Sequence, residues 1–190
     1  MTTPVAEALL TAEEFAQTVD RSGVRTELVR GRIVELPPAM TKHGVLAGFI
    51  HAALLSHVLA HRLGFATSEG GYLLARSPDT VFAPDAAWIA TERVPGGALP
   101  DDAYVEGAPN LAVEVVSPDD RDADVAAKVA DWLAAGAERV WEVRPRTRTV
   151  TVHRPGAPPR TLGDGDTLTS DDAASRVEGF ALGVASIFDQ

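Results

Sequence analysis

Residues 110–118 read NLAVEVVSP, an apolar run with valines at three positions that ends at a proline. Such a run is typical of a buried strand. Alternation along a strand divides it into two faces, one with Ala112, Glu114 and Val116 and the other with Leu111, Val113 and Val115. The second face is purely apolar, whereas the first carries a carboxylate. A buried carboxylate is unfavourable unless it is paired or binds a metal, so Glu114 requires a partner.

The sequence around this strand predicts a mixture of helices and further strands. Helices are expected at 12–20, 43–63 and 123–135, the last two ending at Gly64 and Gly136. Strands are expected within 66–77, with a turn or bulge at Gly70-Gly71, and within 81–90, interrupted by Pro84. Hairpins are expected at 26–36, around Arg30-Gly31, and after residue 139, around Pro145. Residues 93–110 form a loop, and the tail holds short strands and a terminal helix. This order predicts a single α/β (α+β) domain over 1–190, a central mixed β-sheet flanked by helices.

The composition narrows the possible functions. The 190 residues include no cysteine, which excludes disulfides and thiolate metal sites. No apolar run is long enough to predict a membrane span, and the N-terminus lacks the features of a signal peptide, so a cytoplasmic location is expected. The net charge of −10 argues against a broad basic surface for nucleic acid, although arginines concentrate in 142–154.

A second acid, Asp85, follows a proline at the head of another apolar strand. Acids are poor strand formers, although an acid at a strand start is often solvated or part of an ion pair. The helix at 123–135 supplies a lysine, because Lys128 lies at the border of its predicted buried stripe. From there the side chain can extend to water or reach the end of the strand that carries Glu114.

Two carboxylates and a lysine suit metal-dependent phosphodiester hydrolysis. Carboxylate oxygens are preferred ligands of Mg²⁺, whose coordination is completed by water and substrate phosphate. The metal activates water and stabilises charge on the phosphoryl oxygen. An ammonium group positions the attacking water or offsets the growing negative charge. Asp85, Glu114 and Lys128 are therefore candidate catalytic residues.

An ordered series of segments resembles the Uma family of restriction endonuclease-like proteins, within the PD-(D/E)xK nuclease superfamily. The series is TELVRGRIVEL, KHG before a long helix, APDAAWI, LAVEVVSPDD, Lys128, GAERVWEV and TVTVHRPG. It covers the chain from about residue 11 to the end. The resemblance implies a restriction endonuclease-like core, in which Asp85 and Glu114 match the two acids.

One position departs from the superfamily pattern, which places its lysine two residues after the second acid, where this chain has Val116. Within the Uma family the following helix supplies the lysine, and Lys128 matches that position. Glu27 matches an acid of the family's first strand. It is either a third metal ligand or a strand residue that faces solvent.

His43 matches the family's His-Gly pair before the long helix. It either contacts the substrate or caps the helix, and Ser117 is a second candidate for substrate binding.

Three functions remain open. The first is a Mg²⁺-dependent endonuclease, with Mn²⁺ as a possible substitute, that cleaves DNA or another nucleic acid. The second is a non-catalytic or accessory binding module that retains the nuclease fold. The third is a hydrolase of a smaller phosphodiester, which the acidic charge favours. A homodimer is expected, because two-fold dimers are the commonest oligomers and can pair two active sites.

Overall fold

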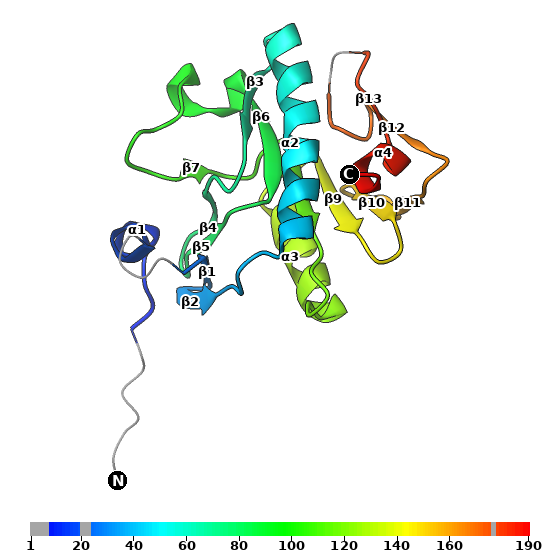
Figure 1. The fold of residues 1–190 in the computed structure, drawn as a ribbon. Helices are drawn as coiled ribbons and strands as arrows, with labels where there is room; N and C mark the ends of the chain where they lie inside the picture. Colours follow the sequence, from blue (N-terminus) through cyan, green and yellow to red (C-terminus); the bar gives the residue numbers. More distant parts are fainter. Residues whose placement is uncertain (1–7, 20–23, 176–177) are drawn as a thin grey trace.

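The centre of the fold is a six-stranded sheet in the order β11-β10-β9-β8-β6-β3 (Figure 1). It is seen in a computed structural model that describes residues 8–19, 24–175 and 178–190. Its strands are β3 (Gly64–Thr67), β6 (Ala86–Ala90), β8 (Leu111–Val115), β9 (Arg139–Arg144), β10 (Thr149–His153) and β11 (Arg160–Leu162). β8 and β9 run parallel and the other neighbours antiparallel. The sheet is therefore mixed, as predicted.

A second sheet contains five strands in the order β2-β1-β5-β4-β7. These are β1 (Thr26–Val29), β2 (Arg32–Glu35), β4 (Tyr72–Ala75), β5 (Thr80–Phe82) and β7 (Val105–Glu106). A further pair consists of β12 (Thr167–Thr169) and β13 (Ala181–Gly183). The β1–β2 hairpin turns at Arg30-Gly31, as predicted, with φ of 50° and 77°. Positive φ at both central residues is typical of the tight turns that connect antiparallel strands.

Two of the crossings between the two large sheets lie within predicted strands, and here the strand prediction was wrong. The segments 66–77 and 81–90, each expected to form one strand, contribute β3 and β4, and β5 and β6, to different sheets. Pro84 lacks an N–H group and breaks the second strand. The two crossings lie side by side, because the Glu69 N–H donates to the Pro84 carbonyl at 3.0 Å. The residues that follow Pro84 therefore lie at the junction of the sheets.

Helices cover both faces of the six-stranded sheet (Figure 1). α2 (Thr41–His61) and α4 (Val184–Phe188) lie on one face and α3 (Asp122–Ala134) on the other, whereas α1 (Ala12–Val19) packs against the five-stranded sheet. Short 3-10 turns, η1 (Thr91–Arg93) and η2 (Pro95–Gly97), lie in the 93–110 segment and just before it. The three predicted helices are present, with ends that differ by one or two residues where the structure describes them; residue 20 lies outside the described residues. α2 ends at a left-handed Arg62 (φ 54°), whereas Gly64 begins β3, so the predicted stop residue was wrong.

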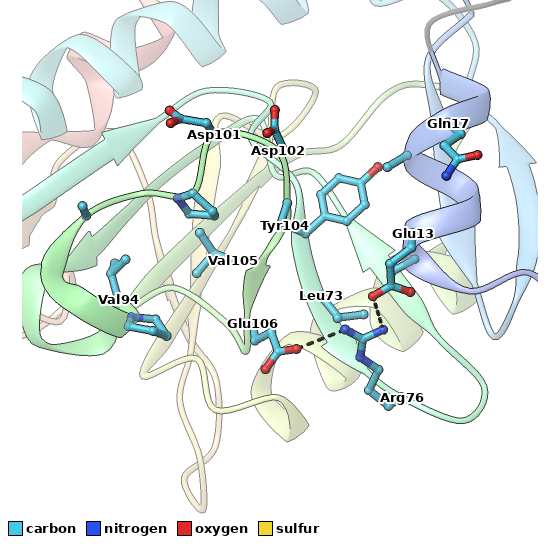
Figure 2. A pocket seen from close by; sticks show the side chains of 16 residues that line it. Glu13, Gln17, Leu73, Arg76, Val94, Asp101, Asp102, Tyr104, Val105 and Glu106 are labelled. Atoms are coloured by element: carbon cyan, nitrogen blue, oxygen red, sulfur yellow. Dashed lines mark hydrogen bonds and ion pairs between the residues drawn. The ribbon is translucent and has the colours of Figure 1, made fainter.

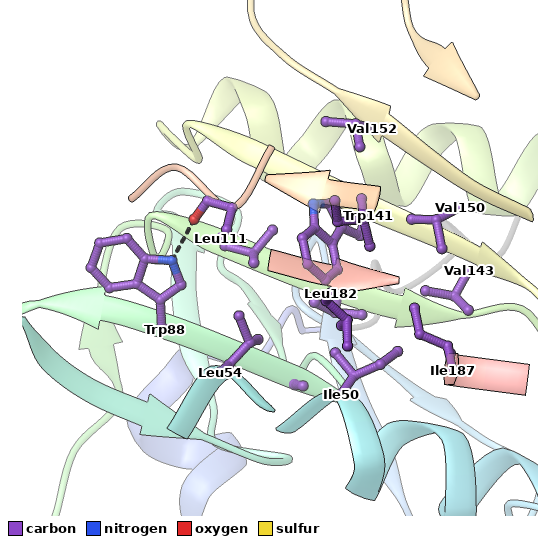
Figure 3. Packing of buried hydrophobic residues seen from close by; sticks show 14 of the residues in the cluster. Ile50, Leu54, Trp88, Leu111, Trp141, Val143, Val150, Val152, Leu182 and Ile187 are labelled. Carbon is purple, nitrogen blue, oxygen red and sulfur yellow. Dashed lines mark hydrogen bonds between the residues drawn. The ribbon is translucent and has the colours of Figure 1, made fainter. Parts of the chain in front are cut away.

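The apolar face of β8 packs against α2, which confirms the predicted division of its residues (Figure 3). Ile50 and Leu54 of α2 and Leu111 of β8 belong to one buried cluster. Trp88 and Trp141 anchor this core, since their indole N–H groups donate to the carbonyls of residues 173 and 172 at 2.6 and 2.7 Å. The main core thus fixes the strand from which Glu114 projects to the opposite side.

On the opposite face, α3 packs between the two large sheets. Its Val129 and Trp132 belong to a buried cluster with Ala112 of β8 and with Tyr72 and Phe82 of the five-stranded sheet. Trp132 is fully buried and meets the rings of Tyr72 and Phe82 edge-on, with centroids 6.0 and 5.8 Å apart. A polar side chain on the buried side of α3 can therefore contact residues of both sheets.

Three large apolar side chains are exposed on α2 or next to it. Val45 and Leu59 are 45% and 64% exposed, and Met40 just before the helix is 69% exposed. By length and composition α2 would also be apolar enough to cross a membrane, which is weak evidence because core helices share that property. This exposed side is a candidate contact surface.

Candidate active site

Asp85 lies between β5 and β6, where the chain passes from the five-stranded to the six-stranded sheet, and is 4% exposed. Its Oδ2 accepts the backbone N–H of Val115 at 2.7 Å, and its own N–H donates to the Val113 carbonyl at 3.0 Å. Because Ala86 pairs with Val113, the residue before Ala86 lies level with Glu114 on β8. The first two predicted acids are thus brought together by strand pairing.

Glu114 points away from the α2 core, toward α3. Its Oε1 accepts the Trp132 indole N–H at 2.8 Å, and its Oε2 accepts the Lys128 ammonium at 3.0 Å. The side chain is 12% exposed. Both oxygens of the Glu114 carboxylate are therefore satisfied by side chains one turn apart on α3.

Lys128 connects the two sheets. Its Nζ lies 2.8 Å from Glu27 Oε1 on β1 and 3.0 Å from Glu114 Oε2 on β8, and it lies 5.3 Å from the centre of the Phe82 ring. Glu27 is 5% exposed, so it is a buried partner and not the solvent-facing residue that one prediction allowed. The lysine at the border of α3 therefore reaches the acid of β8, which is one of the two outcomes that the sequence allowed.

His43 and Arg25 surround the other acid. His43 Nε2 lies 2.9 Å from Asp85 Oδ1, and Arg25 Nη2 lies 3.5 Å from the same oxygen. The remaining ring nitrogen of His43 is 3.4 Å from Ser117 Oγ. His43 lies in the first turn of α2, but it contacts an acid of the site and not the free backbone groups of its helix. Of the two predicted substrate-binding residues, His43 thus contacts an acid of the site, and Ser117 contacts His43.

Burial sets the electrostatics of this network. It raises the pKa of Glu114 to about 7, despite the opposing charge of Lys128. Burial alone would lower the pKa of the Lys128 ammonium, but the Glu114 and Glu27 carboxylates outweigh it and hold that pKa above its ordinary value. Burial likewise opposes ionisation of Asp85, yet His43 and the Val115 N–H keep the pKa of Asp85 below its usual range. The site therefore retains several charges in a restricted space.

The contact between Asp85 and His43 also shifts the pKa of His43. Its hydrogen bond to Asp85 raises the pKa of the imidazole, against the effect of burial. A protonated His43 donates to Asp85 from Nε2, and Ser117 Oγ can then accept from Nδ1. His43 therefore stays protonated beside Asp85 to a higher pH than an ordinary histidine.

Residues 12–184 match the model of the Uma2 family, described as "Putative restriction endonuclease". The chain belongs to the Uma2 family. A search of the curated proteins found no match.

A solved structure supports the fold of this family member. The chain is similar to a crystal structure described as a "putative nuclease" from Anabaena variabilis, with a TM-score of 0.76 and 21% sequence identity. The match covers 95% of this chain and 98% of the other. The predicted family and fold class are therefore confirmed.

The carboxylates of this Uma2-family site are suitable ligands for a hard cation such as Mg²⁺. Among the residues that the structure describes, no three His, Cys, Asp or Glu side chains are grouped to hold a metal. Mg²⁺ does not require such a group, because one or two carboxylates, water and substrate phosphate complete its coordination. Asp85 and Glu114 offer those carboxylates, whereas Glu27 is directed to Lys128.

Two contributors were not identified from the sequence. Trp132 is a buried residue of α3, and its indole N–H also holds Glu114. Trp132 lies one turn after Lys128, on the same side of the helix, and this spacing could have indicated its contact with Glu114. Arg25 lies two residues before Glu27, so both side chains project to the same side of an extended segment. This spacing could have indicated Arg25 once Glu27 was a candidate.

Glu142 is a third residue that the sequence analysis did not single out. It pairs in register with Glu114 across the parallel strands β8 and β9. Its carboxylate binds Arg144 and lies 2.9 Å from His153 Nε2 on β10, and Arg144 also binds Asp122 at the start of α3. This ion-paired group ties the first turn of α3 to the sheet beside the site.

Two cavities lie on the side of the five-stranded sheet. The larger, of about 850 Å³, is lined by α1, by Arg76 and by the 94–106 segment. Figure 2 shows Arg76 between Glu13 and Glu106, its partners at 2.7 and 3.1 Å. None of the candidate catalytic residues lines it. The smaller cavity, of about 300 Å³, is lined by Arg25 and Glu27 among others and adjoins the site.

Proposed function

We propose that this Uma2-family protein is a Mg²⁺-dependent endonuclease that hydrolyses phosphodiester bonds of nucleic acid, with DNA as the expected substrate. One observation carries the proposal: Lys128 bridges the carboxylates of Glu27 and Glu114 at the junction of two sheets. Asp85, held by the backbone N–H of Val115 next to Glu114, lies buried at the same junction. Buried charges in this number are costly to the fold. Their concentration at one place is typical of functional sites.

The roles of the residues follow from their contacts. Asp85 and Glu114 would hold Mg²⁺, with Mn²⁺ as a substitute, and the bound metal would activate water and stabilise phosphoryl charge. Lys128 presents a fixed ammonium to the charge that develops on the phosphate. Trp132 holds one oxygen of Glu114 in place, and His43 does the same for Asp85. Glu27 keeps the ammonium oriented.

The net charge of −10 favours a second candidate, a hydrolase of a smaller phosphodiester. Both candidates use the same residues, so a panel of substrates separates them. The panel contains duplex DNA, single-stranded DNA, RNA and bis(p-nitrophenyl) phosphate, each with Mg²⁺, with Mn²⁺ and with EDTA. We expect metal-dependent cleavage of a nucleic acid by the wild type and none by Asp85→Ala. Turnover of the small diester alone would favour the second candidate, and no turnover of any substrate would leave a binding role.

We also propose that the protein forms a homodimer through the outward side of α2. The exposed apolar residues on and next to this helix, Met40, Val45 and Leu59, support the contact. A two-fold dimer would use the same surface of both copies.

A further inference from the structure

The smaller cavity has a wall of apolar and aromatic side chains. Phe15, Leu36, Phe82 and Tyr104 line it, and it opens between α1, the β1–β2 hairpin and the 69–71 turn. The Phe15 and Tyr104 rings lie 6.2 Å apart and are inclined by 30°. A volume of about 300 Å³ is at the lower end of the range for small-molecule sites. The cavity therefore has room for one small, flat, largely apolar group.

The position of the Tyr104 ring depends on the absence of a side chain at residue 71. A Cβ on Gly71 would lie 2.5 Å from Tyr104 Cδ1, closer than carbon atoms can approach. Phe15 is buried behind Tyr104, whereas Tyr104 itself remains partly exposed. The Tyr104 ring is therefore fixed in position between the two cavities, both of which it lines.

The cavity shares side chains with the active site. Glu27 lines it and accepts the Lys128 ammonium, while the Phe82 ring lies 5.3 Å from the same Nζ. Arg25 also lines it and lies 3.5 Å from Asp85 Oδ1. A group that enters the cavity is thus one side chain away from both Lys128 and Asp85.

Arg25 is free to change partners. Its two carboxylate neighbours, Asp85 and Glu69, lie 3.5 and 3.7 Å away, longer than an ordinary N–H···O hydrogen bond. The Arg25 side chain is 30% exposed. Its guanidinium can therefore turn toward a phosphate oxygen, which its planar fork suits, without breaking a short hydrogen bond.

We propose that this cavity is a subsite for one unstacked nucleobase of the substrate, with Arg25 on the adjoining phosphate. The base stacks on the aromatic wall, and its polar edge faces Arg25, Glu27 and Glu69. A base inside a duplex is not free to enter, so the preferred substrate is single-stranded or locally unpaired nucleic acid. This assignment rests on the proposed function and specifies its substrate.

A binding experiment without metal tests the subsite independently of cleavage. The ¹⁵N-labelled protein is titrated in EDTA with each of the four 2′-deoxynucleoside 5′-monophosphates and, as the base-free control, with 2-deoxyribose 5-phosphate. We expect at least one nucleotide to bind about 5-fold or more tightly than the sugar phosphate, the weaker end of base–aromatic stacking. The backbone amides of Thr26, Gly71 and Ala83 should shift. Those of Gln17 and Ala98, which line the larger cavity, should not.

Variants at Tyr104 separate stacking from other contacts. Tyr104→Phe keeps the ring and should keep the preference for a nucleotide, whereas Tyr104→Leu should abolish it. Ala98→Phe narrows the larger cavity alone and should change nothing. Equal binding of nucleotide and sugar phosphate, shifts confined to the larger cavity, or an unchanged preference in Tyr104→Leu would overturn the subsite, even for a protein that cleaves DNA. Base-dependent binding by a protein that cleaves no substrate would contradict the proposed function and retain the subsite.

Discussion

Glu114 and its two partners show how a charge is accommodated in a buried strand. The Trp132 indole satisfies one carboxylate oxygen and the Lys128 ammonium the other. Glu27 then shares the ammonium, so the positive charge lies between two acids. Asp85 has its own basic neighbours, His43 and Arg25, so each acid of the site lies beside a basic side chain.

The first prediction concerns Trp132. Trp132→Phe removes the indole N–H but keeps an aromatic ring against Tyr72 and Phe82. At pH 8, where Glu114 with a pKa of about 7 is mainly ionised, the loss of a hydrogen bond to a charged group should cost about 1.5–3 kcal/mol of unfolding free energy. Urea denaturation measures this cost. An unchanged midpoint and slope would show that the indole N–H contributes nothing to Glu114.

A second prediction at the residue scale tests Glu114 as a ligand. Glu114→Gln keeps the shape of the side chain and the acceptor for Trp132 but removes the charge. We expect Mn²⁺ affinity, measured by calorimetry, to fall below detection while the circular dichroism spectrum stays unchanged. Glu106→Gln, which changes an exposed acid outside the site, is the matched control. Wild-type affinity in Glu114→Gln would remove this residue from the metal site.

At the scale of elements, Asp79 fixes α1 against the five-stranded sheet. Its Oδ2 accepts the Ala12 N–H at 2.8 Å, and Oδ1 accepts the Ser77 N–H at 3.1 Å. Burial opposes its ionisation, but these N–H donors and Arg76 hold the pKa of Asp79 below its ordinary value. An acid with a lowered folded-state pKa stabilises the fold above its unfolded-state pKa, and this stability is lost as the pH falls through the folded-state pKa.

The third prediction follows from the lowered pKa of Asp79. Asp79→Asn should lower the unfolding free energy at pH 7 by about 1–3 kcal/mol, because a buried acceptor for two N–H groups is weakened. The difference between variant and wild type should shrink as the pH falls from 5 toward 3. Denaturation at a series of pH values measures it, with Asp164→Asn, an exposed surface pair, as the control. A difference that is constant over this range would contradict the role assigned to the Asp79 charge.

Local patterns in the sequence were sufficient to predict most elements but not their sheet membership. The hairpin at Arg30-Gly31 and the helix before Gly136 follow from turn residues and apolar spacing. The crossings near Gly70 and Pro84 do not, because an apolar run has the same appearance in either sheet. The sheet that a strand joins is decided by its pairing with segments that are distant in the sequence.

The site was predictable to a similar extent. Glu114 and Asp85 stand out as acids in apolar strands, and Lys128 as a cation at the border of a buried stripe. Arg25 and Trp132 have no such contrast with their surroundings, since an arginine near a strand and a tryptophan in a stripe are ordinary. Their roles depend on three-dimensional contacts to acids on other elements.

For the whole molecule, the fourth prediction is dimerisation through α2. Leu59 is 64% exposed on that helix, so Leu59→Glu should place a charge in the contact. Sedimentation at micromolar concentration should give about twice the 20.0 kDa chain mass for the wild type and the chain mass for the variant. Leu99→Glu, at an exposed loop residue, should remain dimeric. A wild type that sediments as a monomer would refute the dimer.

The central claim is that Lys128 and the two acids form a metal-dependent hydrolytic site. The most direct measurement is the single-turnover rate of cleavage of a nucleic acid that the wild type cuts, across a range of Mg²⁺ concentrations, for wild type, Lys128→Met and Lys42→Met. These are the two lysines of the chain, and Lys42 is exposed. We predict Mg²⁺-dependent cleavage by the wild type and Lys42→Met, and a rate about 100-fold lower in Lys128→Met, the scale for loss of one preorganised electrostatic group. Cleavage at the full wild-type rate by Lys128→Met, or cleavage that does not depend on the metal, would contradict the account.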